Sequence, residues 1–185
     1  MADRYKLDPR QSRFTVQAFA TGMLSMFGHN PTFAVRDFSG TVRFVGDEAG
    51  GIVLELTALA DSLDLIDRVK PGDRAEIMER MKRDVLETAA FSHVTFQSTD
   101  VSDVVIAPGR FQVRFGGNLT LHGVTRPQRV EGELGVFADG VRLQGETSLN
   151  MTDYRIKPVS ALGGTIKLQD DVKLTFDLVG TPEGT

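Results

Sequence analysis

Apolar and polar residues alternate along most of this chain. In the clearest run Phe111, Val113 and Phe115 alternate with polar or small residues, and Leu119 and Leu121 keep the same odd parity. Successive side chains of a β-strand point to opposite faces of a sheet, so this run predicts a long strand with one apolar face.

A turn and a second strand follow this run. Gly123 and Pro127 break the alternation, and apolar or small residues then recur at even positions from 130 to 136. This pattern predicts a β-hairpin. The glycine pair at 116–117 predicts a bend or bulge within the first strand, because glycine inside a strand often marks one.

The same alternation predicts six further strands. Their approximate positions are 13–22, 32–46 with a shift near Asp37, 52–58, 91–101, 141–149 and 172–178. Asp139 and Gly140 form a sequence typical of a hairpin turn. Eight long strands without a regular alternation of strands and helices indicate an all-β fold, an eight-stranded antiparallel barrel that closes on itself and so has no exposed edge.

Residues 71–86 form one short amphipathic helix in this interpretation. An apolar stripe runs from Ile77 to Val85, and Asp73 and Glu76 have the spacing of a capping box. Two glutamate–arginine pairs at i,i+4 spacing support the helix. The stripe suits core packing, although its methionines also suit an adaptable apolar mouth.

A second apolar segment, from Met23 to Phe27, precedes Pro31 and is either a plug packed on the core or a mobile lid. Together with the helix, it is the natural cover for one end of the barrel. We expect at least one of the two segments to cover the mouth and to loosen for ligand exchange.

The composition favours an apolar ligand inside the barrel. The chain has 12 phenylalanines, two tyrosines and no tryptophan, so an aromatic interior has few polar groups. Each buried methylene contributes roughly 0.8 kcal/mol, whereas association costs roughly 4 to 15 kcal/mol. About ten carbons would barely balance that cost, so a long chain is favoured.

We expect the ligand to contact inward residues of the strands and apolar residues of the two covering segments. These residues are Phe14, Val16, Met23, Met26, Phe27, Phe38, Phe44, Leu54, Ile77, Met81, Phe96, Phe111, Phe115 and Phe176. His29 and Arg155 are candidates for contact with a polar headgroup, and a surface role is the alternative for Arg155.

Charge and length restrict the other partners. The net charge of −4 and the scattered basic residues argue against nucleic acid, and the 185 residues fit a single domain, 1–185. There is no run of about 18 apolar residues that could span a membrane. The first residues are charged and resemble no secretory signal, which predicts a cytoplasmic protein.

Catalytic and metal-binding motifs are not evident. The three histidines, His29, His93 and His122, lack the close spacing of zinc motifs, and there is no cysteine, P-loop or G-x-S-x-G sequence. We expect no cofactor, no metal and no enzymatic activity. The alternative is a histidine-dependent or metal-dependent enzyme acting on an apolar substrate. His122 is expected to hold its turn through a ring-to-backbone hydrogen bond.

One segment also carries a family resemblance. The sequence L-T-L-H-G-V-T-R-P at 119–127 resembles the hallmark of the YceI family of bacterial polyisoprenoid-binding, lipocalin-like barrels. The segments at 5–12 and 91–98 match in the right order, except that His93 stands where the family usually has proline. The resemblance implies binding, carriage or sequestration of a polyisoprenoid lipid or isoprenoid quinone. It also implies a possible homodimer, and related proteins that are often periplasmic.

Overall fold

The computed structural model describes residues 4–22, 30–45, 51–157, 159–161 and 166–183. Most of them lie in β-strands, joined by one α-helix and short helical turns. The strands are β1 (Arg4–Leu7), β2 (Arg13–Gly22), β3 (Thr32–Val35), β4 (Phe38–Phe44), β5 (Ile52–Leu59), β6 (Leu63–Leu65), β7 (His93–Ala107), β8 (Arg110–Leu121), β9 (Val124–Phe137), β10 (Gly140–Asn150), β11 (Ser160–Ala161) and β12 (Ile166–Pro182). The helical segments are η2 (Ala60–Ser62), α1 (Pro71–Arg80), η3 (Met81–Val85) and η4 (Met151–Tyr154).

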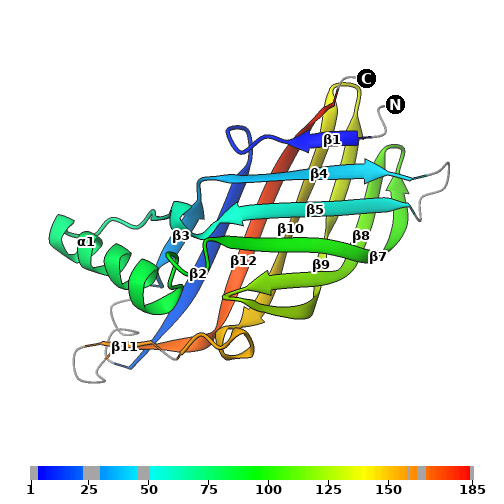
Figure 1. The fold of residues 1–185 in the computed structure, drawn as a ribbon. Helices are drawn as coiled ribbons and strands as arrows, with labels where there is room; N and C mark the ends of the chain where they lie inside the picture. The colour runs from blue at the N-terminus through cyan, green and yellow to red at the C-terminus, as the bar shows by residue number, and fades with distance from the viewer. Residues whose placement is uncertain (1–3, 23–29, 46–50, 158, 162–165, 184–185) are drawn as a thin grey trace.

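Eight strands form a closed antiparallel ring in the order β1-β4-β5-β7-β8-β9-β10-β12, which confirms the predicted eight-stranded barrel (Figure 1). The ring closes because the last residues of β12 pair with β1. The earlier part of β12 pairs with β2, and the pairing then continues through β3 to β6.

The barrel has two different ends. We call the end that carries α1, η4 and the turn between β8 and β9 the helix end (Figure 1). The hairpin end carries the β7–β8 and β9–β10 turns, and β1 pairs there with the end of β12. The predicted Asp139-Gly140 turn joins β9 to β10 at this end.

Several strand predictions need correction. β1 was missed because its alternation covers only four residues. The predicted strand at 32–46 is divided into β3 and β4 at Asp37, whose N–H bonds the Ser62 hydroxyl at 3.0 Å. β7 continues to Ala107 and β12 to Pro182, beyond the predicted ends. The irregularity expected at 116–117 lies in the partner strand β7, opposite these glycines.

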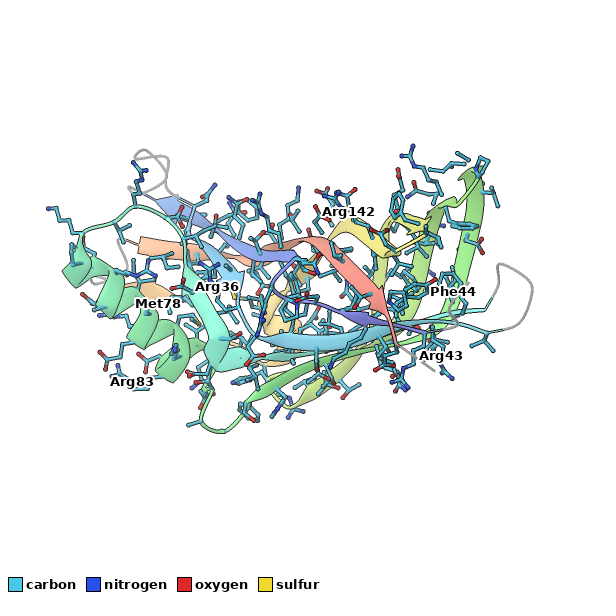
Figure 2. The ribbon with its side chains drawn as sticks, turned by 90° about the horizontal axis from the view of Figure 1, so that it is seen from above. Arg36, Arg43, Phe44, Met78, Arg83 and Arg142 are labelled. Carbon is cyan, nitrogen blue, oxygen red and sulfur yellow. The ribbon has the colours of Figure 1, made fainter. Side chains whose placement is uncertain are left out.

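The core fills the inner face of the barrel. Adjacent residues of β4 show the alternation: Arg43 is exposed on the outside and Phe44 packs against the core (Figure 2). Ring centroids lie 5.9 Å apart, edge to face, in the Tyr5–Phe44 and Phe14–Phe38 pairs. Among the described residues, the only polar groups of side chains buried in this core are the hydroxyls of Tyr5 and Tyr154.

The helix begins earlier than its predicted cap. Pro71 occupies the first helical turn and Lys70 is the N-cap residue without a side-chain cap bond, so the predicted capping box at Asp73 and Glu76 is wrong. The physical reason is that proline at the start already has a helical φ and lacks the N–H that a cap would satisfy. The two expected i,i+4 ion pairs are present.

Candidate functional site

The inner face of the barrel is the first part of the candidate site. Five of the residues expected to contact the ligand are buried in the main core, and four more pack against it half-buried. The buried set is Phe38, Leu54, Phe96, Phe115 and Phe176, and the half-buried set is Phe14, Val16, Phe44 and Phe111. The structure therefore brings these nine residues together on one apolar surface.

Two of these phenylalanines lie over glycines of a neighbouring strand. A Cβ atom on Gly117 would lie 2.6 Å from Cζ of Phe96, and one on Gly145 would lie 2.7 Å from Cζ of Phe176. Each ring thus occupies the space that a side chain would take on the adjacent strand. These two rings lie along the wall of the barrel and enlarge its apolar inner surface.

Of the residues expected at the mouth of the barrel, only those of the helix lie in the described part of the chain. Met81 and Ile77 belong to a second cluster, in which Met81 is buried with Phe33 and Leu65 at the helix end. Leu63 and Leu86 contact both clusters, so the helix packs against the end of the barrel core. Met23, Met26, Phe27 and the headgroup candidate His29 lie outside the described residues.

The second part of the site is an interruption in the barrel wall between β9 and β10. The two strands pair in register from Phe137–Gly140 to Glu131–Glu146, where their ladder ends. Closer to the helix end, 124–130 pair only with β8, and 147–150 pair only with β12. Pro127 lies in this part of β9, which is consistent with an edge because proline donates no ladder hydrogen bond.

Side chains cross this interruption. The Gln128 amide donates to the Thr147 hydroxyl at 2.9 Å and to the Ser148 carbonyl at 3.2 Å. The Thr147 hydroxyl donates to the Arg129 carbonyl at 2.9 Å. Closer to η4, Nε of Arg126 donates to the Asp153 carbonyl at 2.7 Å. Side-chain hydrogen bonds therefore replace the missing backbone ladder.

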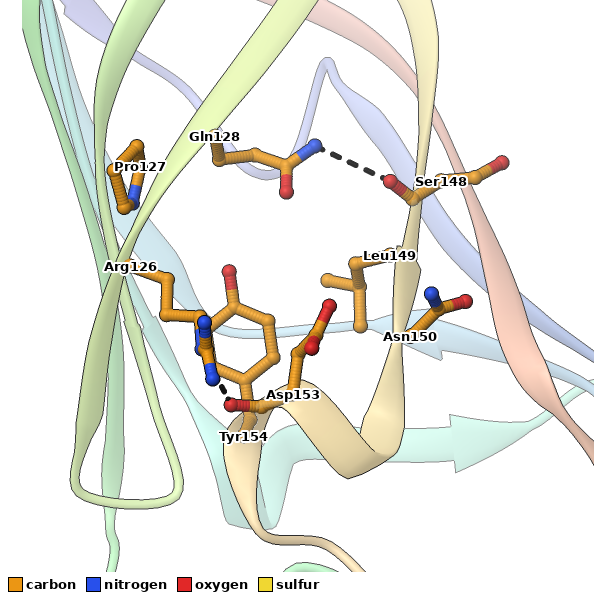
Figure 3. A pocket seen from close by; sticks show the side chains of 8 residues that line it. All are labelled: Arg126, Pro127, Gln128, Ser148, Leu149, Asn150, Asp153 and Tyr154. Atoms are coloured by element: carbon orange, nitrogen blue, oxygen red, sulfur yellow. Dashed lines mark hydrogen bonds between the residues drawn. The ribbon is translucent and has the colours of Figure 1, made fainter.

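A pocket of about 200 Å³ occupies the interruption, and we call it the window (Figure 3). Its lining residues are Arg126, Pro127, Gln128, Ser148, Leu149, Asn150, Asp153 and Tyr154. Leu149 and Tyr154 also belong to the main core. The window thus joins the apolar interior to a polar rim in the wall of the barrel.

Tyr154 is the central residue of the window. Its side chain belongs to the core, the residue is 2% exposed, and its hydroxyl points into the pocket (Figure 3). No described residue bonds this hydroxyl. Burial raises the pKa of Tyr154, the Asp153 carboxylate raises it further and Arg126 opposes the shift. The hydroxyl is therefore neutral at ordinary pH and can donate a hydrogen bond.

Contacts of η4 hold Tyr154 in place. The segment ends at Arg155, which has a φ of 58°, and the Thr152 N–H donates to the Asp170 carboxylate at 2.8 Å. Nδ1 of His122 lies 3.2 Å from the Tyr154 carbonyl oxygen, and its Nε2 lies 2.7 Å from the Glu87 carboxylate. The expected ring-to-backbone bond of His122 thus joins its turn to η4. Arg155 is exposed and outside the window lining.

The sequence prediction missed the window residues. The strand was expected to restart at Val130, whereas β9 begins at Val124 and carries Arg126 and Gln128 on the same parity as the core residues Val124 and Val130. The polar residues Arg126 and Gln128, at two successive inward positions, were the feature of the sequence that could have predicted the window. They indicate a place where the inner face meets something other than apolar packing.

Metal sites and membrane-spanning helices are not found among the described residues. Within the described residues, no group of three or more histidines, aspartates or glutamates could hold a metal ion, and His93 is exposed with its Nδ1 2.8 Å from the Ser92 hydroxyl. No helix among these residues is both long and apolar enough to cross a membrane.

Comparison with protein families places the chain clearly. The YceI-like domain model matches residues 5–180. UPF0312 proteins of Shewanella oneidensis and Vibrio campbellii are 31% and 30% identical over 128 and 127 residues, about 65% of this chain. The matched region spans about three fifths of the length of these relatives, 61% and 59%.

Solved structures share the fold at low sequence identity. BcnA of Burkholderia cenocepacia has a TM-score of 0.73 at 17% identity, covering 95% of this chain and 99% of BcnA. A polyisoprenoid-binding domain from Saccharophagus degradans, implicated in plant cell wall breakdown, has a TM-score of 0.67 at 15% identity, with 99% and 100% coverage. The YceI protein of Campylobacter jejuni has a TM-score of 0.59 at 15% identity, with 81% and 84% coverage.

Proposed function

Because this chain belongs to the YceI-like domain family, we propose that its barrel binds one long apolar ligand, a polyisoprenoid lipid or an isoprenoid quinone, and carries or sequesters it. One observation carries the proposal: a closed ring of eight strands encloses an inner face whose described buried side chains are apolar apart from two tyrosine hydroxyls. The Saccharophagus degradans domain, described as polyisoprenoid-binding, has the same fold and supports the class of ligand.

The energetics favour a chain of more than ten carbons. Each buried methylene contributes roughly 0.8 kcal/mol, so a chain of about twenty carbons gains roughly 16 kcal/mol, more than the roughly 4 to 15 kcal/mol cost of association. Such a ligand needs no specific hydrogen bond for affinity. Its polar groups would then decide which of several lipids is retained.

The direct test is to fill the interior without introducing a charge. Ala18 is buried on β2 opposite Val172, with the apolar parity of that strand, so Ala18→Phe places a ring inside the barrel. Loss of contact with about two ligand methylenes should weaken lipid binding about tenfold. Native mass spectrometry of protein purified from cells, and titration of delipidated protein, measure the retained and rebound lipid.

Ser39→Phe is the matched control. Ser39 is exposed on β4, so the same ring is added outside the barrel and should leave lipid binding unchanged. Equal binding by Ala18→Phe and the parent protein would contradict an interior site. A parent protein that neither retains nor rebinds any apolar molecule would overturn the proposal as a whole.

No specific observation on the described residues favours the enzymatic alternative. Both ring nitrogens of His122 have structural partners: Nδ1 faces the Tyr154 carbonyl of η4, and Nε2 faces the Glu87 carboxylate. His29 lies outside the described residues. The binding function is therefore the one that the described geometry supports.

A further inference from the structure

We propose that the window between β9 and β10 binds the headgroup of the ligand, a neutral ring that carries carbonyl oxygens, while the apolar tail lies in the barrel. This inference rests on the proposed function and adds the site and the chemistry of the polar end. It assigns selectivity among lipids to Tyr154 and Arg126, two residues that line the window where it meets the apolar interior.

The window is continuous with the interior. Tyr154 and Leu149 belong both to the main core and to the lining of the window. An amphipathic molecule can therefore place its tail against the core and its polar end in the interruption of the wall. The inward parity of Arg126 and Gln128 on β9 turns their side chains toward this junction.

The donors in the window are suited to an acceptor. The Tyr154 hydroxyl points into the pocket from a residue that is 2% exposed, and no described residue bonds it. Arg126 uses Nε for the Asp153 carbonyl, and its terminal nitrogens make no hydrogen bond to a described residue. A carbonyl oxygen of the ligand accepts from such donors without adding charge.

The charges and the volume select a neutral ring. The Arg126 guanidinium and the Asp153 carboxylate both line the window, so their charges balance and a diphosphate would meet the carboxylate. A cavity of about 150 Å³ can hold a benzene ring, and the window has about 200 Å³. Long ligands need larger sites, of about 300 to 1,000 Å³, so the window fits one substituted ring and the tail lies elsewhere.

The experiment compares three probes on delipidated protein: a decyl benzoquinone, decylbenzene and farnesyl diphosphate. The first two probes each have a six-membered ring and a decyl tail, and only the quinone carries carbonyl oxygens. Affinity is measured by displacement of a fluorescent fatty-chain probe. Tyr154→Phe removes only the hydroxyl and should weaken decyl benzoquinone binding about 5- to 10-fold, with decylbenzene unchanged. Arg126→Met should act in the same direction.

Tyr5→Phe is the control variant. Tyr5 is also 2% exposed, but it lies on β1 and packs against Phe44, away from the window. Removal of the Tyr5 hydroxyl should leave the affinities for decyl benzoquinone and decylbenzene unchanged. Thermal unfolding of the three variants shows whether each is folded.

Tyrosine emission gives a second readout of position. The chain has two tyrosines and no tryptophan, so each Tyr→Phe variant leaves one tyrosine emitter. A quinone ring in contact with a tyrosine quenches its emission. Decyl benzoquinone should therefore quench Tyr154 in the Tyr5→Phe variant more strongly than it quenches Tyr5 in the Tyr154→Phe variant.

The outcomes separate the two proposals. If decyl benzoquinone and decylbenzene bind but Tyr154→Phe affects both equally or neither, the headgroup site is wrong and the proposed function stands. Tighter, Arg126-dependent binding of farnesyl diphosphate would overturn the neutral headgroup. If neither ring probe binds the parent protein, the headgroup site is wrong. If the parent protein also retains no lipid from cells, the proposed function itself fails.

Discussion

The two halves of the β9–β10 pair are held together by different interactions. In the half at the hairpin end, residues 131–137 and 140–146 pair in continuous register, and Leu134 and Leu143 face each other in the core. In the half at the helix end, 124–130 and 147–150 have no ladder between them. Side chains of Gln128, Thr147 and Arg126 connect that half.

This difference in bonding suggests that the two halves of the hairpin have different roles, one in stability and the other in ligand recognition. Backbone pairing satisfies N–H and C=O groups on both strands and leaves no interruption of the wall between them. Where the ladder stops, the strands need side-chain bonds, and a pocket with a polar rim appears beside an apolar interior. The paired half should therefore dominate stability, and the window half should dominate selectivity for the ligand.

The largest expected effect comes from truncating one leucine in each half. Leu134→Ala, at a fully buried position opposite Phe111 and Leu143, should lower the free energy of unfolding by about 3 to 5 kcal/mol. Leu149→Ala, at the window, should cost about 2 kcal/mol, because the pocket already borders that side chain. Urea unfolding measures both, and a larger loss for Leu149→Ala would contradict the comparison.

A second pair of variants removes a glutamine of the window half and a glutamine of β8 that bonds the paired half. Gln128→Ala deletes the amide that bridges to Thr147 and Ser148, and should cost about 1 to 2 kcal/mol while hydrogen exchange at 147–150 becomes faster. Gln112→Ala, whose amide donates to the Gly132 carbonyl, should cost about 0.5 kcal/mol because the ladder remains. Equal exchange rates in the two variants would show that Gln128 does not hold the window.

A smaller effect is expected from an ion pair beside the paired half. The Arg142 side chain, and secondarily Gln144, lowers the pKa of Asp177 against an opposing effect of burial. A lowered folded pKa gives stability that is present above the unfolded pKa of about 3.9 and lost as the pH falls through the folded pKa. Asp177→Asn should therefore cost about 0.5 to 1 kcal/mol at pH 7 and nothing in strong acid.

Acid titration of unfolding checks this prediction. The parent protein and Asp177→Asn should differ in stability near neutral pH and converge as the pH falls below about 3.9. A stability difference that persists unchanged in acid would mean that the charge on Asp177 is not its cause.

The smallest effect concerns the window charge. The Asp153 carboxylate contributes to the raised pKa of Tyr154, after burial. Asp153→Asn should move that pKa toward its ordinary value and leave stability at pH 7 nearly unchanged, since the structure shows no ion pair for Asp153 among the described residues. Ultraviolet titration in a Tyr5→Phe background follows Tyr154 alone. An unchanged tyrosine titration would remove Asp153 from the electrostatics of the window.

The sequence by itself determined the barrel and most of its apolar inner face. Period-two alternation fixes which residues share a face, so Phe96, Phe115 and Phe176 were placed inward without knowledge of the fold. The family resemblance at 119–127 also lies on the strands and turn that the pattern predicted, and residues 5–180 match the YceI-like domain. The face on which a residue lies and the family motif both depend on nearby residues in the chain, so the sequence alone is enough to predict them.

Only the tertiary structure decided where the wall is interrupted and which groups meet there. Arg126 and Tyr154 are far apart in the sequence, and their meeting depends on where the β9–β10 ladder stops. The end of a ladder is set by the geometry of both strands together with their other partners, β8 and β12. The alternation of apolar and polar residues does not show where a ladder ends. A residue on the inward parity has the same pattern whether its strand is paired on both sides or on one.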